Sequence, residues 1–227
     1  MCSKESVRCE GRQVTTRYVA GILMPDGATA RAASDLMRDH QPDLLLNAAC
    51  RTFVFASLLG HSRALRFDPE LLFIAALFLR VGITRLYAES QQRFEVDSAE
   101  AAAQFLRGHG RTWEEIGQVW DAIALHTTPG IAQHKAPLTA LLCAAVETDL
   151  TGAHCECFSP TAQALVLAAY PREAGFKFKF LHAMALGQVH RPQSTVGTAN
   201  ADVLAFYTHR LNAGGFCERL LASTWPY

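Results

Sequence analysis

The stretch that decides the fold reads Ala75-Ala76-Leu77-Phe78-Leu79-Arg80-Val81-Gly82-Ile83-Thr84. Its first residues are apolar on every face, which is typical of a helix buried inside a protein. We expect this helix to begin at Asp68-Pro69, because an aspartate caps a helix N-terminus and a proline fits the first turn. It is predicted to run to about Arg80 and to end near Gly82. Arg80 therefore puts a permanent positive charge at the end of a core helix.

Working outward, the rest of the chain also predicts helices. Seven further segments carry helical apolar patterns or helix-ending residues, at about 44–59, 97–107, 113–127, 137–150, 160–169, 175–188 and 199–211. No segment alternates convincingly between apolar and polar residues as a strand does, and no repeat or linker separates two domains. The sequence predicts an all-α fold: a single helical domain over residues 21–227, preceded by an N-terminal extension, residues 1–20, that we expect to be poorly ordered.

Composition narrows the classes of function. Of the 227 residues, 50% are hydrophobic, and the formal net charge is zero. This balance argues against a nucleic-acid binder, which usually has a basic excess. The first residues lack the apolar core of a signal peptide, and we find no run of about 20 apolar residues that would span a bilayer. The seven cysteines therefore favour free thiols in a reducing compartment, and we expect a cytoplasmic protein.

Several motifs occur along the chain in a recognisable order. They are Asn47-Ala48-Ala49-Cys50-Arg51, the Leu79-Arg80 stretch, Arg93-Phe94-Glu95-Val96-Asp97-Ser98-Ala99, Glu147-Thr148-Asp149-Leu150-Thr151-Gly152 and Tyr170-Pro171-Arg172. Together they resemble the motifs of HD-domain proteins of the cyanamide hydratase-like group. The resemblance implies an HD-type helical domain. In that family a metal held by a His, a His-Asp pair and an Asp activates a water, which adds to a small nitrile-like substrate.

The resemblance also implies that the metal site has been lost. Ala48 stands at the family's first metal histidine, and Leu79-Arg80 stands at the His-Asp pair. A leucine cannot donate to a metal, and an arginine repels one. Asp149 alone remains of the four ligands. We therefore expect no bound metal and no cofactor, and we expect Arg80 to form an ion pair with Asp149 in place of the missing cation.

The resemblance places His109 and His126 at pocket positions of the family, and we expect these two histidines and Arg80 to be catalytic. The residues predicted to bind the substrate are Phe73, Phe78, Leu79, Thr84 and Asp149. Leu79 and Ala48 are expected to replace a polar cage by a larger apolar cavity. Plainer interpretations stay open, because a histidine on an apolar helix is more often a satisfied core group. The Arg80–Asp149 pair can likewise serve the fold alone.

Three functions remain open. The first is a metal-independent cyclase, or pericyclase, that guides an intramolecular cycloaddition of the Diels–Alder, norbornene-forming type. Its substrate is expected to be a hydrophobic terpenoid-like intermediate of fungal secondary metabolism, as in antibiotic biosynthesis. Norbornene-forming pericyclases of sordarin-type diterpene pathways resemble the same group, and a cycloaddition needs only a folded conformer and a donor on the dienophile carbonyl.

The second function is a metal-dependent hydratase or hydrolase whose site is rebuilt from Asp149, His109 and His126. The third is a non-catalytic pseudoenzyme that binds a small molecule. In each case we expect the partner to be a small molecule rather than a nucleic acid or a membrane. For the cyclase we expect a hydrophobic substrate that can carry a carboxylate and an enal.

Overall fold

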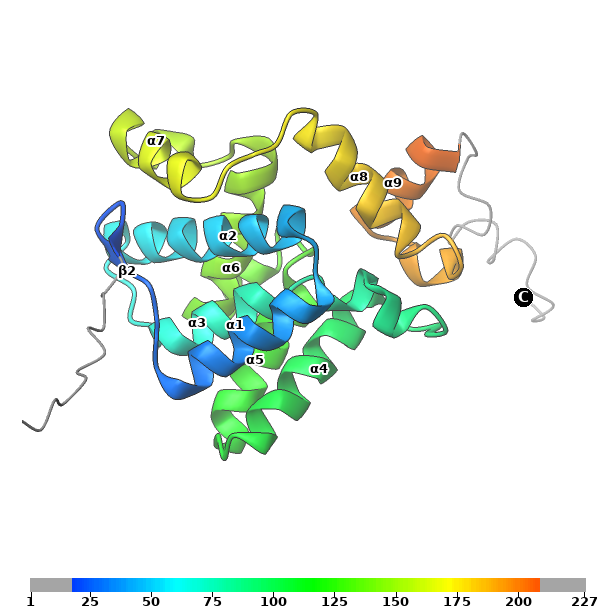
Figure 1. Cartoon of the computed structure of the whole chain (residues 1–227), viewed down its shortest axis with the longest axis horizontal. Helices are drawn as coiled ribbons and strands as arrows, with labels where there is room; N and C mark the ends of the chain where they lie inside the picture. Colours follow the sequence, from blue (N-terminus) through cyan, green and yellow to red (C-terminus); the bar gives the residue numbers. More distant parts are fainter. Residues whose placement is uncertain (1–17, 209–227) are drawn as a thin grey trace, which may run out of the picture.

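The computed structural model describes residues 18–208, and helices dominate this part of the chain (Figure 1). The α-helices are α1 (Ala28–His40), α2 (Asp43–Ser62), α3 (Pro69–Phe78), α4 (Phe94–Gly108), α5 (Trp113–Leu125), α6 (Pro137–Thr151), α7 (Pro160–Ala169), α8 (Phe176–Leu186) and α9 (Ala199–Thr208). Two strands of two residues each, β1 (Tyr18–Val19) and β2 (Ile22–Leu23), pair antiparallel before α1. The predicted all-α fold is confirmed.

The longest helix, α2, runs through the middle of the molecule. In Figure 1 it lies between α7 on one side and α1, α3, α4 and α5 on the other, and it packs against α3 and α6. By length and composition α2 is long and apolar enough to cross a membrane, so our prediction that no segment is long enough was wrong. However, 67% of its most apolar window is buried inside the protein, as in the core helix of a folded domain.

The start of α3 follows its sequence closely. Asp68 accepts hydrogen bonds from the backbone N–H groups of Glu70, at 2.8 Å, and Leu71, at 3.0 Å, and Pro69 is the first helical residue. The helix ends at Phe78, because the chain then tightens into the short 3-10 helix η1 (Val81–Ile83). A Cβ on Gly82 would lie 2.2 Å from the carbonyl oxygen of Phe94. The glycine therefore lets α4 pack directly onto η1.

Several boundaries differ from the prediction. Helix α1 was not predicted, and α4 begins at Phe94 rather than at about residue 97. Ser98 lies inside α4, and its hydroxyl oxygen accepts a hydrogen bond from the N–H of Gly82 at 2.9 Å. Asp97 instead forms a buried ion pair with Arg191. Residues 1–17 of the expected extension and 209–211 of the expected last helix lie outside the described residues, whereas residues 18–19 form β1.

The last two helices, α8 and α9, pack against each other at one end of the molecule (Figure 1). Helix α8 contacts α2 and η1, and three of its apolar side chains are buried in a small hydrophobic cluster. The members of this cluster are Leu45, Ala48, Ile83, Phe94, Phe176, Phe180 and Met184. This arrangement brings α8 and α9 over the ends of α3, α5 and α6, where the candidate site lies.

Candidate functional site

A cavity of about 460 Å³ lies between the α8–α9 pair and the body of the domain. Its apolar lining comes mainly from Val146, Leu150, Phe176, Phe180, Met184 and Val203. Its polar lining includes Arg80, His126, Thr127 and Asn200. A mostly apolar hollow with a few convergent polar groups is typical of a small-molecule site.

Arg80 is buried in the wall of this cavity. Only 2% of the residue is exposed, and its guanidinium carbon lies 5.0 Å from the centre of the Phe180 ring. Its Nη1 atom is buried and has no hydrogen-bond partner among the described residues. Burial lowers the pKa of Arg80 to about 10. The negative charge of Asp149 opposes this shift, and the positive charge of Arg51 adds a smaller lowering. Arg80 therefore stays charged at neutral pH, and the protein encloses a donor that it leaves unused.

The predicted ion pair between Arg80 and Asp149 is wrong. Both oxygens of Asp149 are already held by Arg51, whose Nε lies 2.7 Å from Oδ1 and whose Nη2 lies 3.2 Å from Oδ2. Arg172 adds a contact of 2.9 Å to Oδ1. Asp149 is fully buried and does not line the cavity, so the structure does not bring this predicted substrate-binding residue to the candidate site.

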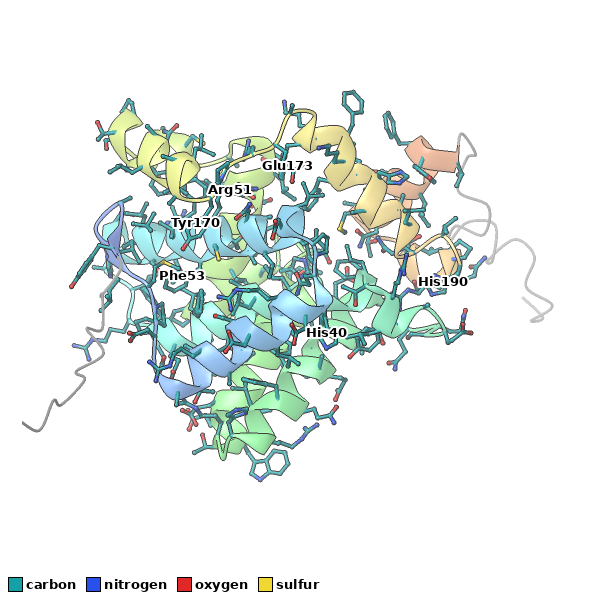
Figure 2. All side chains as sticks on the ribbon, viewed as in Figure 1. His40, Arg51, Phe53, Tyr170, Glu173 and His190 are labelled. Carbon is teal, nitrogen blue, oxygen red and sulfur yellow. The ribbon has the colours of Figure 1, made fainter. Side chains whose placement is uncertain are left out.

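Arg51 reaches Asp149 from α2. Figure 2 shows its side chain directed from that helix toward the segment that carries Tyr170. There its Nη1 donates to the carbonyl oxygens of Tyr170, at 3.1 Å, and Pro171, at 3.2 Å. Arg51 and Arg80 are both buried, and Asp149 is paired with Arg51 rather than with Arg80. A buried guanidinium without an ion-pair partner favours a ligand with an electron-rich oxygen.

His126 follows the last turn of α5 and is 4% exposed. Its Nδ1 lies 2.6 Å from the carbonyl oxygen of Ile123. Burial lowers the pKa of His126 to about 4, although the negative charge of Glu95 opposes this shift. The imidazole is therefore neutral at neutral pH, and it lines the cavity as the sequence predicted.

A buried glutamate organises the polar groups around His126. Oε1 of Glu95 accepts hydrogen bonds from Arg93 Nη2 at 3.1 Å, from Thr127 Oγ1 at 2.6 Å and from Asn200 Nδ2 at 3.0 Å. Burial alone would raise the pKa of Glu95, but the hydrogen bonds and positive charge around it hold the pKa below its usual value. Glu95 thus joins α4, the end of α5 and α9 on one side of the cavity.

Other predicted residues lie elsewhere. His109 is exposed after the end of α4, and its ring stacks on Phe105 with centroids 4.1 Å apart. Phe73 and Phe78 are core residues that pack on Phe53 and Phe105, respectively. Leu79 and Ala48 are fully buried. None of these five predicted residues lines the cavity, so the enlarged hollow expected at Leu79 and Ala48 is filled by neighbouring side chains.

Thr84 lines a different hollow, of about 610 Å³, between the end of α1 and α8. His40 and His190, which Figure 2 labels, also line this second hollow. Its charged and histidine side chains are exposed, unlike Arg80 and His126. Buried polar groups have lost their water and bind a ligand more selectively, so the cavity at Arg80 is the stronger candidate site.

The described residues do not fit the metal of the HD resemblance. They contain no group of three or more His, Cys, Asp or Glu side chains placed to hold an ion. Asp149, the one ligand position that the sequence retains, is engaged by two arginines.

Phe180, Asn200 and Glu95 are parts of the site that were not predicted from the sequence. The four-residue spacing of Phe176 and Phe180 was a usable signal, because it places both side chains on one face of a helix. Nothing local in the sequence marked Asn200. No protein-family model and no curated protein matches this chain.

Proposed function

We propose that this chain is a metal-independent cyclase, which holds a hydrophobic terpenoid-like molecule in the cavity beside α8 and guides an intramolecular cycloaddition. The observation that carries the proposal is Arg80, a buried guanidinium with an unpartnered Nη1, in a cavity wall that is otherwise largely apolar. An unsatisfied buried donor costs free energy in the folded protein. A bound oxygen acceptor would remove that cost.

The lining suits this chemistry. Apolar side chains can hold a flexible substrate in the one folded conformer in which diene and dienophile meet. Two new carbon–carbon bonds then form within the substrate, and no atom is exchanged with the protein. A charged guanidinium on the dienophile carbonyl stabilises the electron density that builds on the oxygen. One such donor is worth about 2.7–4 kcal/mol, or about 10²–10³ in rate, where water is excluded.

The motif resemblance supports the same proposal from another direction. We propose that the chain derives from the cyanamide hydratase-like HD group, with Ala48, Leu79 and Arg80 replacing metal ligands. A scaffold without these ligands can still enclose a substrate. Fungal secondary metabolism and a cytoplasmic location belong to this proposal.

The test uses the full chain and a synthetic probe in which a tether of terpenoid size joins a cyclopentadiene to an enal. Rate and stereoisomer ratio are measured against the uncatalysed reaction. We expect acceleration with one dominant isomer, and we expect Arg80→Met to lose about 10²–10³ of the acceleration. His109→Ala is the matched control, because His109 lies on the surface away from the cavity. Equal rates and isomer ratios for the parent and Arg80→Met would contradict the proposal.

A binding protein without catalysis is the second candidate, and the same unpartnered donor favours it. The same assay separates the two. Saturable binding of the probe with an unchanged cyclisation rate would establish the binding protein. The hydratase alternative has no comparable support, since Asp149 is held by Arg51 and Arg172.

A further inference from the structure

The hydrogen-bonding state of His126 is fixed by its surroundings. A carbonyl oxygen can only accept, so the contact of 2.6 Å between Nδ1 and the oxygen of Ile123 requires the proton on Nδ1. In a neutral imidazole Nε2 then carries a lone pair and can only accept. The lowered pKa of His126 keeps the ring in this neutral form at neutral pH.

The groups near His126 leave that lone pair available. The side chains of Arg93, Thr127 and Asn200 all donate to Glu95, whose charge acts on His126. No described residue donates to Nε2 of His126. His126 and Arg80 line the same cavity, and the charge of Arg80 acts on the imidazole. Among the buried side chains of this wall, Arg80 therefore offers a donor and His126 offers an acceptor.

We propose that this wall recognises a hydrophobic hydroxy-carbonyl compound, whose carbonyl oxygen accepts from Arg80 and whose hydroxyl donates to Nε2 of His126. The inference deepens the proposed function, since it names the substrate class of the same cavity. It requires binding alone and no turnover. His126 thereby determines specificity, because it accepts a hydrogen bond from the hydroxyl group of the ligand.

A ligand with only a carbonyl leaves Nε2 of His126 without a partner. A ligand with a single hydroxyl must satisfy both the guanidinium and Nε2 with one group, since a hydroxyl both accepts and donates. A carboxylate has no hydrogen to donate, so its second oxygen would face the lone pair of Nε2 unless the imidazole took up a proton. Unpaired buried polar groups are what give such a site its selectivity. The hydroxy-carbonyl group satisfies both without any change of protonation.

The experiment is calorimetric titration of the full chain with three ring compounds of one size: 2-hydroxycyclododecanone, cyclododecanone and cyclododecanol. We expect the hydroxy-ketone to bind about five- to tenfold more tightly than the ketone, the value of one added net hydrogen bond. The alcohol should also bind more weakly than the hydroxy-ketone, because it offers one polar group where Arg80 and His126 present two. Absence of binding by the hydroxy-ketone, or equal affinity for it and the ketone, would overturn the inference.

Two variants assign the effect to Nε2. In His126→Asn the amide nitrogen can replace Nδ1 at the carbonyl oxygen of Ile123, while the Nε2 acceptor is deleted. In this variant the ratio of the affinities for the hydroxy-ketone and the ketone should fall to about one, with the affinity for the ketone unchanged. In His126→Gln an amide oxygen can stand near the place of Nε2 and should retain part of the preference. A folded His126→Asn protein that keeps the full preference would show that Nε2 of His126 does not bind the hydroxyl.

A measurement on the unmodified protein covers the case in which the variants do not fold. Nitrogen-15 NMR of the histidine side chains distinguishes a protonated from an unprotonated ring nitrogen. We expect His126 to show a proton on Nδ1 only, and we expect the hydroxy-ketone to shift the Nε2 resonance more than the ketone does. A proton on Nε2 in the free protein would contradict the inference. The cyclisation assay is separate, so failure of the proposed catalysis leaves this binding result intact, and the reverse also holds.

Discussion

The guanidinium of Arg80 has a cost to the fold that its replacement should reveal. It is buried, has one unpartnered nitrogen and lies within the electrostatic reach of Arg51. Its contact with the ring of Phe180 offsets only part of this cost. We expect Arg80→Met to leave the free energy of unfolding unchanged or to raise it by about 1–2 kcal/mol. Chemical denaturation measures this, and a loss of stability would show that Arg80 has a partner in solution.

The opposite result is expected at Asp149. Asp149→Ala leaves the buried Arg51 without its counter-charge, since the two side chains are paired at 2.7 Å and both are fully buried. The free energy of unfolding should fall by about 3–5 kcal/mol. Equilibrium denaturation in urea, with Arg80→Met as the comparison, tests the difference. Similar stabilities for the two variants would mean that Asp149 does not neutralise Arg51.

For single residues, the sequence predicted that Arg80 and His126 lie in a pocket, but it did not predict which residues pair with the buried charges. Arg80 and His126 were expected in a pocket, and both line the cavity. Arg51 lay in a quoted motif, yet nothing in the sequence showed that it reaches Asp149 across 98 positions of chain. The expected role of His109 rested on alignment to a pocket position, whereas the actual chain places it after the last turn of α4.

Helix α8 depends on a close approach that only a glycine permits. A Cβ on Gly187 would lie 2.4 Å from the Cβ of Ile83 and 2.5 Å from its carbonyl oxygen. Gly187→Ala should therefore push α8 away from η1 and cost about 1–3 kcal/mol. Gly117→Ala is the matched control, because this position in α5 has no atom within 4 Å of the added Cβ. That control should gain about 0.5–1 kcal/mol.

Thermal unfolding of both glycine variants tests this prediction. A Gly187→Ala protein as stable as the parent would show that α8 can shift freely. Ligand titration of the same variant adds a second readout, since displacement of α8 also moves Phe180 and Met184 in the cavity wall.

Elements were predictable where local chemistry marks them. Asp68-Pro69 placed the start of α3 correctly, because capping depends on adjacent residues alone. Helix α1 was missed because Gly27 before it provides no side-chain cap, and because its fully buried residues are mainly small: Ala30, Ala33 and Met37. Alanines carry little apolar signal, although they pack well against a neighbouring helix.

Over the whole molecule, the buried His126 makes stability depend on pH. A histidine in the unfolded chain has a pKa near 6.5, whereas burial lowers the pKa of His126 in the fold to about 4. Between pH 6.5 and 4 this histidine binds a proton in the unfolded chain but not in the folded protein. The contribution of His126 to the free energy of unfolding is therefore complete above pH 6.5 and is lost as the pH falls toward 4. The full loss is about 3 kcal/mol.

Urea denaturation at a series of pH values across this window checks the prediction. Glu95, which also has a lowered pKa, destabilises the fold at still lower pH, and His126→Asn separates the two groups. That variant should show a shallower decline between neutral and mildly acidic pH. The same decline in both proteins would contradict the assignment to His126.

The overall helical architecture was predictable because apolar periodicity is spread over the whole chain. The cavity was not, since its walls join Arg80 and His126 to α8 and α9, which are distant in sequence. No pattern within one segment encodes how two such parts meet. The arrangement depends instead on contacts such as that of α8 with η1.

The position of α8 and α9 at the end of the described chain has a consequence for timing. A ribosome delivers the chain from its N-terminus, so α1 to α7 emerge before the last wall of the cavity. Phe180 of α8 contacts the guanidinium of Arg80, so this contact forms only when α8 docks. A chain cut within the exposed segment 171–175 would keep α2 to α6 covalently intact but would bind the ligand more weakly. The rate of limited proteolysis at this segment therefore reports how completely the site is assembled, and bound ligand should lower that rate.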